Sequence, residues 1–146
     1  MIVPDINLRL YAYNDGSPFY SVARSWWEDL VNGPERIGVP WVVVVGFVRL
    51  IINPSAIEFP MSPLEAVDNV RSWFEYPHIV PLNPGPDHLI YFQRNMEVSG
   101  IGRNLAPDAH IAALAMERGA EIHSNDSDFG RFPGLRWRNP LESENG

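Results

Sequence analysis

The feature that most constrains the fold of this chain is an alternation of short apolar runs with longer segments of helical periodicity. The expected strands are residues 2–4, a run ending at residues 38–40, and residues 78–82, 121–124 and 135–138. The expected helices are a short one carrying Leu8, Tyr11 and Ala12, followed by residues 17–33, 40–52, 62–74, 88–98 and 107–119. Strands that alternate with helices indicate βα units, in which helices cover a short, mostly parallel sheet.

Two helix starts are marked by a Ser-Pro pair. The segment SPFYSVARSWWEDLVNG has Ser17 as a cap, Pro18 in its first turn and Gly33 as its stop. The segment SPLEAVDNVRSWF repeats this start, and Glu65 three residues after Ser62 makes a capping box. Both patterns predict helices.

The most apolar segment, VPWVVVVGFVRLII at residues 39–52, has 14 residues and is interrupted by Arg49. A bilayer needs roughly 20 apolar residues, so we expect a buried element and no contact with a membrane. Its length and the Asn53-Pro54 stop favour a helix over a strand. The first residues, MIVPDINLRL, lack the features of a secretory signal, so we expect a cytoplasmic protein.

The composition suits one globular domain over residues 1–146, with residues 141–146 expected as a frayed tail. Of the 146 residues 45% are hydrophobic, which supplies a core, and the absence of Cys excludes disulfides and thiolate metal sites. The net charge is -7, which argues against a broad basic surface for nucleic acid. A polyanion would have to be bound locally or together with metal ions.

Four carboxylates fall near places where an α/β sheet gathers its sites. Asp5 closes the first strand, Asp126 and Asp128 follow the strand that ends near Ser124, and Asp108 lies in the first turn of a helix. Carboxylates that converge repel one another unless a cation lies among them, so the cluster predicts a metal. With no Cys and no metal-binding His spacing, oxygen ligands favour Mg²⁺ or Mn²⁺. Each Asp taken alone could equally be a turn former or a helix-start residue.

A calcium-binding loop is the obvious competitor for the Asp126-x-Asp128 pair. Counting along such a loop from Asp126 puts Arg131 where Gly is needed and Trp137 where a bidentate Glu is needed. That alternative fails.

The motifs PDIN (residues 4–7), NLAPDAHIAALAMERGA (104–120) and SNDSDFGRFPGLRWRNPL (124–141) together resemble those of PIN-domain ribonucleases, specifically VapC-type toxins of type II toxin-antitoxin systems. The resemblance runs across nearly the whole chain. It implies a three-layer α/β/α domain and a Mg²⁺- or Mn²⁺-dependent endoribonuclease that acts on structured RNA such as tRNA or rRNA. It also implies a homodimer and a VapB-type antitoxin whose C-terminal segment blocks the site.

Carried over by matching motif, the metal-site acids are Asp5, Asp108 and Asp126, with Asp128 as a further catalytic acid. Asn7 and Ser124 match polar positions that hold the acids and water in this family. Arg103 and Arg131, and also Arg136 and Arg138, lie near the acidic motifs in sequence and are candidate phosphate contacts, although solvated or ion-paired Arg is an equal alternative.

One departure from the family pattern concerns a Glu that many members carry in the helix after the second strand. Here that helix has Gly46 near the expected place and no acid, so the ligand set is one carboxylate short. Glu58, Asp68 or water could substitute, or the metal could bind more weakly. The missing Glu also keeps open a PIN-like module that binds RNA or protein without cleaving. Phosphatase chemistry through an aspartyl intermediate is disfavoured because position 7 is Asn.

Neither the His nor most of the Trp residues are expected to take part in the chemistry. The four His show no HxH or HExxH pattern, so we expect packing or surface roles. The expected helices carry Trp26, Trp27, Trp41 and Trp73, which we assign to the core or to an interface, whereas Trp137 is left open.

Overall fold

The computed structural model describes residues 1–100 and 105–142. Five parallel strands form one sheet in the order β3-β2-β1-β4-β5. The strands are β1 (Ile2–Pro4), β2 (Ile37–Pro40), β3 (Ile79–Leu82), β4 (Glu121–His123) and β5 (Arg136–Arg138). The predicted parallel sheet is therefore confirmed.

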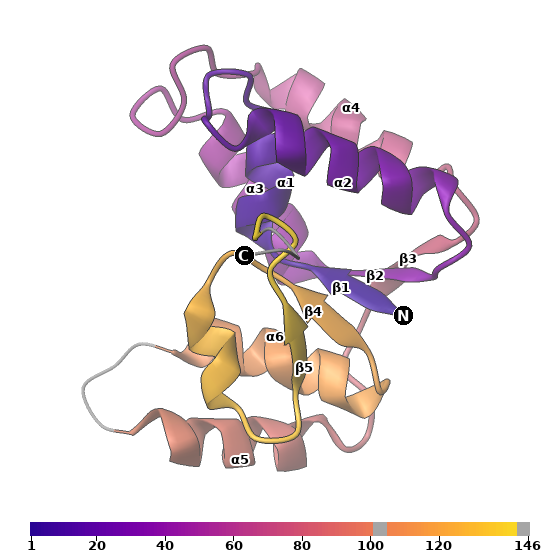
Figure 1. Ribbon diagram of the computed structural model, residues 1–146, viewed down its shortest axis with the longest axis vertical. Helices are drawn as coiled ribbons and strands as arrows, with labels where there is room; N and C mark the ends of the chain where they lie inside the picture. Colours follow the sequence, from indigo (N-terminus) through magenta and orange to yellow (C-terminus); the bar gives the residue numbers. More distant parts are fainter. Residues whose placement is uncertain (101–104, 143–146) are drawn as a thin grey trace.

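Within the described residues, six α-helices and one 3₁₀ helix connect the strands. They are α1 (Ile6–Ala12), α2 (Tyr20–Asn32), α3 (Trp41–Ile51), α4 (Pro63–Trp73), α5 (His88–Ser99), α6 (Ala106–Glu117) and the 3₁₀ helix η1 (Ser127–Arg131). Figure 1 shows α1 to α4 on one side of the sheet and α5 and α6 on the other, which is the expected three-layer arrangement. In the part of the chain that the structure describes, no helix is long and apolar enough to cross a membrane.

Each face of the sheet has its own hydrophobic core. On the first face, buried side chains of α1 to α4 pack together with Ile37 and Val39 of β2. On the second face, the Ala-rich helix α6 packs with Val3 and Ile122. Strands of only three or four residues thus lie between two apolar layers.

The long apolar segment of residues 39–52 divides as predicted into the end of β2 and the helix α3. Pro40 has an extended backbone, with φ -64° and ψ 145°, and caps the helix that begins at Trp41. Val43 and Phe47 of α3 are buried, whereas Trp41 is 50% exposed. Trp41 is therefore not part of the core, and of the two roles predicted for it only an interface contact remains.

The prediction that α2 starts at the Ser17-Pro18 pair is wrong by two residues. Ser17 Oγ accepts the N–H of Phe19 at 3.1 Å, and the Ser17 carbonyl accepts the N–H of Tyr20 at 3.1 Å. These bonds close a separate turn, and α2 begins at Tyr20 without a side-chain cap. A Ser side chain can satisfy a turn as well as a helix start, and here the turn wins.

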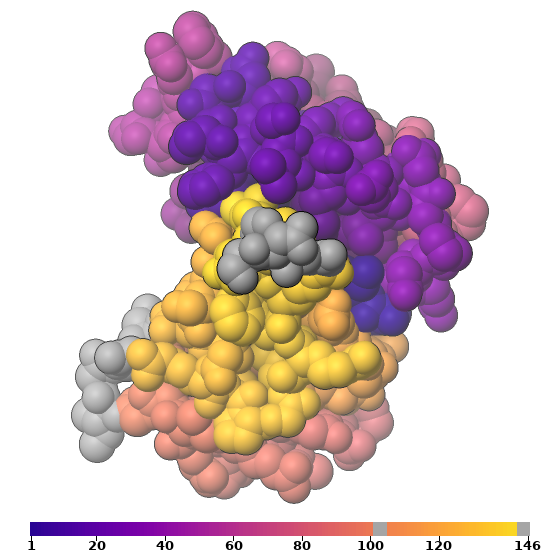
Figure 2. Space-filling model, viewed as in Figure 1, coloured from indigo at the N-terminus to yellow at the C-terminus, as the bar shows by residue number. Residues whose placement is uncertain are grey.

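The first residue of the expected frayed tail, Leu141, makes contacts, and the expectation for the rest of the tail stays a prediction. Leu141 packs against the first core, and its N–H donates to Asn139 Oδ1 at 3.0 Å. Residues 143–146 lie outside the described residues. In Figure 2 the segment formed by η1 and β5 fills the middle of the visible face, below α1 and α2.

The close approach of α3 to α1 depends on Gly46. A Cβ added there would lie 2.5 Å from Ile6 Cδ1, so any side chain at this position would require the Ile6 side chain to shift. Two neighbouring helices therefore meet with a glycine backbone against an Ile side chain.

We expect Gly46→Ala to lower the free energy of unfolding by about 1–3 kcal/mol, because overpacking outweighs the better helix propensity of Ala. Urea unfolding measures the change. Val45→Ala, one residue away and 64% exposed, is the matched control and should be nearly neutral. Adding Ile6→Val removes the clashing Cδ1 and should recover part of the loss. If Gly46→Ala costs as much in the Ile6→Val background as in the wild type, this account is contradicted.

Candidate metal-binding active site

The carboxyl ends of the neighbouring strands β1 and β4 bring the predicted acids together. Asp5 follows β1, and its N–H donates to the carbonyl of His123 in β4 at 2.9 Å. Ser124 follows β4, so the loop that carries Asp126 leaves the sheet next to Asp5. Parallel pairing of two short strands thus joins motifs that lie more than a hundred residues apart.

Asp5 has a structural and an electrostatic part in the site. One carboxylate oxygen, Oδ1, accepts the N–H of Ile6 at 2.8 Å and caps α1, and Oδ2 accepts the Ser124 hydroxyl at 2.7 Å. The residue is only 6% exposed. Burial raises the pKa of the Asp5 carboxyl, and the hydrogen bonds from Ser124 and Ile6 oppose that rise.

The Ser124 hydroxyl is the junction between the two loops. It donates to Asp5 and accepts the N–H of Asp126 at 3.0 Å and Nδ2 of Asn7 at 3.4 Å. Asn7 Oδ1 in turn accepts the N–H of Asn125 at 3.3 Å. Asn7 and Ser124 therefore lie beside the acids, and the roles that the resemblance implies for them stay predictions.

Three carboxylates gather at this junction. One oxygen from each of Asp108, Asp126 and Asp128 lies within 4.8 Å of the others, and all three residues are half-buried. Asp126 also caps η1, because its Oδ1 accepts the N–H of Asp128 at 2.9 Å. Asp5 lies outside this group of three but interacts electrostatically with Asp108 and Asp126.

The carboxylates of the cluster repel one another, although Asp128 is paired with Arg131. Burial, followed by the negative charges of Asp126, Asp5 and Asp128, raises the pKa of Asp108 to about 7. Asp108 and Asp126 also share a side-chain hydrogen bond, which favours the protonated form of Asp108. Three converging oxygen donors that repel one another fit a hard divalent cation, which would replace that proton.

The Glu that is missing at Gly46 is not replaced by either of the two acids suggested for that role, Glu58 and Asp68. Gly46 is packed against Ile6, so an acid at this position would have to displace the Ile6 side chain. Asp68 is exposed and pairs with Arg71 at 2.7 Å, and Glu58 is exposed on a loop. Among the described residues neither Asp68 nor Glu58 joins the carboxylate group, whereas Asp128 does.

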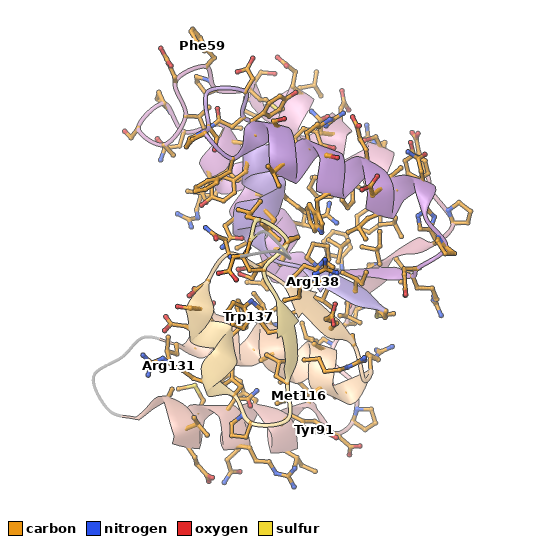
Figure 3. All side chains as sticks on the ribbon, viewed as in Figure 1. Phe59, Tyr91, Met116, Arg131, Trp137 and Arg138 are labelled. Atoms are coloured by element: carbon orange, nitrogen blue, oxygen red, sulfur yellow. The ribbon has the colours of Figure 1, made fainter. Side chains whose placement is uncertain are left out.

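The candidate phosphate contacts have different positions. Arg131 Nε pairs with Asp128 Oδ1 at 3.0 Å, and nearly half of its side chain is exposed. Arg136 lies at the amino end of β5, away from the acids, and donates to the carbonyl of Gly119. Arg138 lies at the carboxyl end of β5, opposite His123. Figure 3 shows Arg131, Trp137 and Arg138 on the face formed by η1 and β5. Arg103 lies outside the described residues.

Some residues of the site were not found from the sequence. Asn139 Nδ2 donates to Asn125 Oδ1 at 2.8 Å, and Trp137 Nε1 donates to the Ser124 carbonyl at 3.0 Å. These bonds fasten the acidic loop to β5. Both residues lie in the segment RWRNPL, which follows the acids closely in sequence and could have indicated that they lie near the site.

The His residues pack in the interior or beside other elements, as expected. His123 is buried and accepts a hydrogen bond from Trp26 Nε1 at 2.9 Å, while its Nε2 lies 2.8 Å from Glu121. His88 Nε2 lies 2.9 Å from Nδ1 of His110, and His78 Nε2 lies 3.2 Å from the Leu30 carbonyl.

The PIN domain family model matches residues 2–135. The chain belongs to the PIN-domain family. Two curated relatives from Mycobacterium tuberculosis are similar over nearly the full length of both chains. Ribonuclease VapC33 is 40% identical over 141 residues, covering 97% of this chain and 99% of the relative. Ribonuclease VapC37 is 39% identical over 140 residues, covering 96% and 97%.

Solved structures share the fold of this PIN domain at much lower identity. VapBC2 from Rickettsia felis, bound to a promoter DNA fragment, has a TM-score of 0.65 at 19% identity over 95% of this chain and 98% of the other. VapC20 from M. tuberculosis, described as a toxin that cleaves the sarcin-ricin loop, has a TM-score of 0.64 at 17% identity over 93% and 99%. These similarities support the PIN fold.

We expect Asp108→Asn to stabilise the metal-free domain. The folded-state pKa of Asp108, about 7, lies above the usual 3.8, so protonation favours the folded state. In EDTA the wild type should therefore lose stability as the pH rises from about 4 to about 7, and the Asn variant should lose less. At pH 8 we expect the Tm of the variant to be about 4 °C higher, the order of shift that about 1 kcal/mol produces.

Thermal unfolding at pH 5 and pH 8 checks this expectation. Asp68→Asn is the matched control, because Asp68 is exposed and paired on α4 and should leave the pH dependence unchanged. A lower Tm of Asp108→Asn at pH 8 would contradict the repulsion described above.

Proposed function

We propose that this chain is a metal-dependent endoribonuclease toxin that a cognate VapB-type antitoxin inhibits. The observation that carries the proposal is the group of three half-buried carboxylates, Asp108, Asp126 and Asp128, at the carboxyl ends of β1 and β4. Full-length relatives at 39–40% identity are named ribonucleases. The function is proposed for one domain over the whole chain, acting in the cytoplasm.

An RNA substrate requires a cation in this site. The chain has a net charge of -7, and converging carboxylates would repel a phosphodiester. Oxygen donors without Cys or His select a hard ion, and we propose Mg²⁺ or Mn²⁺. When bound, the ion supplies positive charge to the scissile phosphate and Lewis acidity toward water.

The acids have different tasks in this proposal. Asp108, Asp126 and Asp128 hold the cation, and Asp5 completes the negative site. Asp5 already accepts bonds from Ile6 and Ser124, but a carboxylate has about four lone-pair positions and can still face a cation or its water. Ser124 and Asn7 keep the two acidic loops at a fixed separation, which positions the donors before substrate arrives.

Besides the cation, we assign Arg131 to contact the phosphates of the RNA. Its Nε pairs with Asp128, which leaves the two terminal nitrogens of an exposed guanidinium for a phosphodiester. Arg103 stays a prediction for a second contact. A structured RNA such as tRNA or rRNA remains the proposed substrate class, as the resemblance implies.

The proposed protein partners are the antitoxin and a second copy of the chain. Several solved structures with this fold are antitoxin-toxin complexes, among them VapBC2 from R. felis and VapBC-1 from Haemophilus influenzae. Trp41 on α3 is 50% exposed, which suits a homodimer contact.

A binding module that does not cleave is the weaker alternative. Its support was the acid missing near Gly46. Asp128 contributes a third carboxylate to the group, so the site does not depend on that Glu.

We expect Asp126→Asn to reduce RNA cleavage roughly 100-fold or more, because it removes a charged donor from the group that holds the cation. Purified wild type is incubated with total RNA in Mg²⁺, Mn²⁺ or EDTA, and new 5′ ends are mapped by sequencing. Asp68→Asn should cleave like the wild type. Equal cleavage by Asp126→Asn, or cleavage undiminished in EDTA, would overturn the proposal.

A further inference from the structure

His123 is the last residue of β4 and comes directly before the hydroxyl that joins the two acidic loops. Its carbonyl accepts the N–H of Asp5 at 2.9 Å, and the next residue, Ser124, donates its hydroxyl to Asp5 at 2.7 Å. The strand has only three residues, so His123 is the last of them before the loop that carries Asp126. Contacts that hold His123 in place therefore act on the position of the acids.

The imidazole of His123 has a defined tautomer. Trp26 Nε1 lies 2.9 Å from His123 Nδ1, and an indole N–H can only donate, so Nδ1 is an acceptor without a proton. The proton of the neutral ring is then on Nε2, which lies 2.8 Å from Glu121 Oε1 and donates to it. Only this tautomer makes both hydrogen bonds.

The two bonds join α2 to β4 through a network of three side chains, Trp26, His123 and Glu121, which we call the imidazole network. Trp26 and His123 are both buried, and their ring centres lie 6.1 Å apart. Water competes little for hydrogen bonds in such surroundings, so the network holds the imidazole in one orientation. An apolar side chain at position 123 would fill the space without burying ring nitrogens, so the network supplies direction as well as volume.

We propose that the imidazole network positions the candidate metal site. It fixes the end of β4, and the hydroxyl of Ser124 carries that position to Asp5 and Asp126. The inference rests on the proposed function for the nature of the site. Within the described chain Glu121 is not among the carboxylates that gather there, so the network acts through Ser124 and supplies no ligand.

The first test removes one donor of the network and keeps an aromatic ring. Trp26→Phe leaves no N–H for His123 Nδ1, so the imidazole can take its other tautomer and turn. We expect the Kd for Mn²⁺, measured by titration calorimetry, to rise roughly 5-fold or more, because partners of metal ligands typically contribute 10- to 100-fold and this network lies one step further out. Binding that persists in Asp126→Asn belongs to other sites and is subtracted.

Trp73→Phe is the matched control. Trp73 Nε1 donates to Tyr13 OH at 2.7 Å, so this change removes the same atoms and an equivalent hydrogen bond from the same core. We expect the Tm to fall by similar amounts in the two variants, while Trp73→Phe changes the Mn²⁺ Kd less than about twofold, as a separate site should. An unchanged Kd in Trp26→Phe, or an equal rise in both variants, reduces the network to packing and overturns the inference.

A second pair of variants separates hydrogen bonding from charge at Glu121. Glu121→Gln keeps an oxygen that accepts the Nε2–H of His123, whereas Glu121→Ala does not, and both remove the same negative charge. The side chain is 34% exposed, so neither change leaves a closed cavity. We expect Glu121→Ala to raise the Mn²⁺ Kd roughly 3-fold or more and Glu121→Gln to recover most of that loss. Equal Kd values for the two variants contradict a role of this hydrogen bond.

The tautomer can be read by NMR without any metal. In EDTA the wild type should show His123 with a bare Nδ1 and a protonated Nε2, and Trp26→Phe should populate the other tautomer. A protonated Nδ1 in the wild type contradicts the network.

Failure of the inference and failure of the proposed function give different results. A wild type that binds Mn²⁺ at the acids but cleaves no RNA overturns the ribonuclease function and leaves the Kd comparisons valid. A wild type that cleaves RNA, with an unchanged Mn²⁺ Kd in Trp26→Phe, overturns the positioning role alone.

Discussion

The site depends on the hydroxyl of Ser124 more than on any single acid. That one group donates to Asp5 at the end of β1 and accepts the N–H of Asp126 in the loop after β4. It is fully buried, so its bonds do not compete with water. Short parallel strands alone would leave the loops free to separate under the repulsion of their charges. The hydroxyl ties the two loops together.

The sequence allowed the order and type of the elements to be predicted because those signals are local. Apolar periodicity and the capping box at Ser62 act within one turn, and the helix over Pro63–Trp73 begins where they indicate, with Ser62 Oγ accepting the N–H of Glu65 at 3.2 Å. The start of α2 was missed because Ser17 makes equivalent bonds in a turn. Convergence of Asp108 and Asp126 followed from their places at a helix start and a strand end.

Other features depend on neighbours distant in sequence, which no local pattern contains. Nothing in NLRLYAY marks Arg9 as buried, because its environment comes from Trp27 and Trp73 on two other helices. The inclusion of Asp128 in the carboxylate group depends on how η1 turns after Asp126. Asp5 and Arg9 are four residues apart on the chain, yet one faces the acids and the other the aromatic core.

The double role of Asp5 bears on how a gene for such a protein can lose its activity in evolution. In the proposed site, a change at Asp5 would remove a charge together with the cap of α1, so the product would be both inactive and less well folded. Asp108 makes no cap hydrogen bond, and its charge opposes folding, so in the proposed site a neutral residue there would give an inactive protein that persists. Such a protein would still occupy the antitoxin and thereby release active copies. A substitution at Asp5 would silence the gene. A substitution at Asp108 would instead give a protein that competes with active copies for the antitoxin in the same cell.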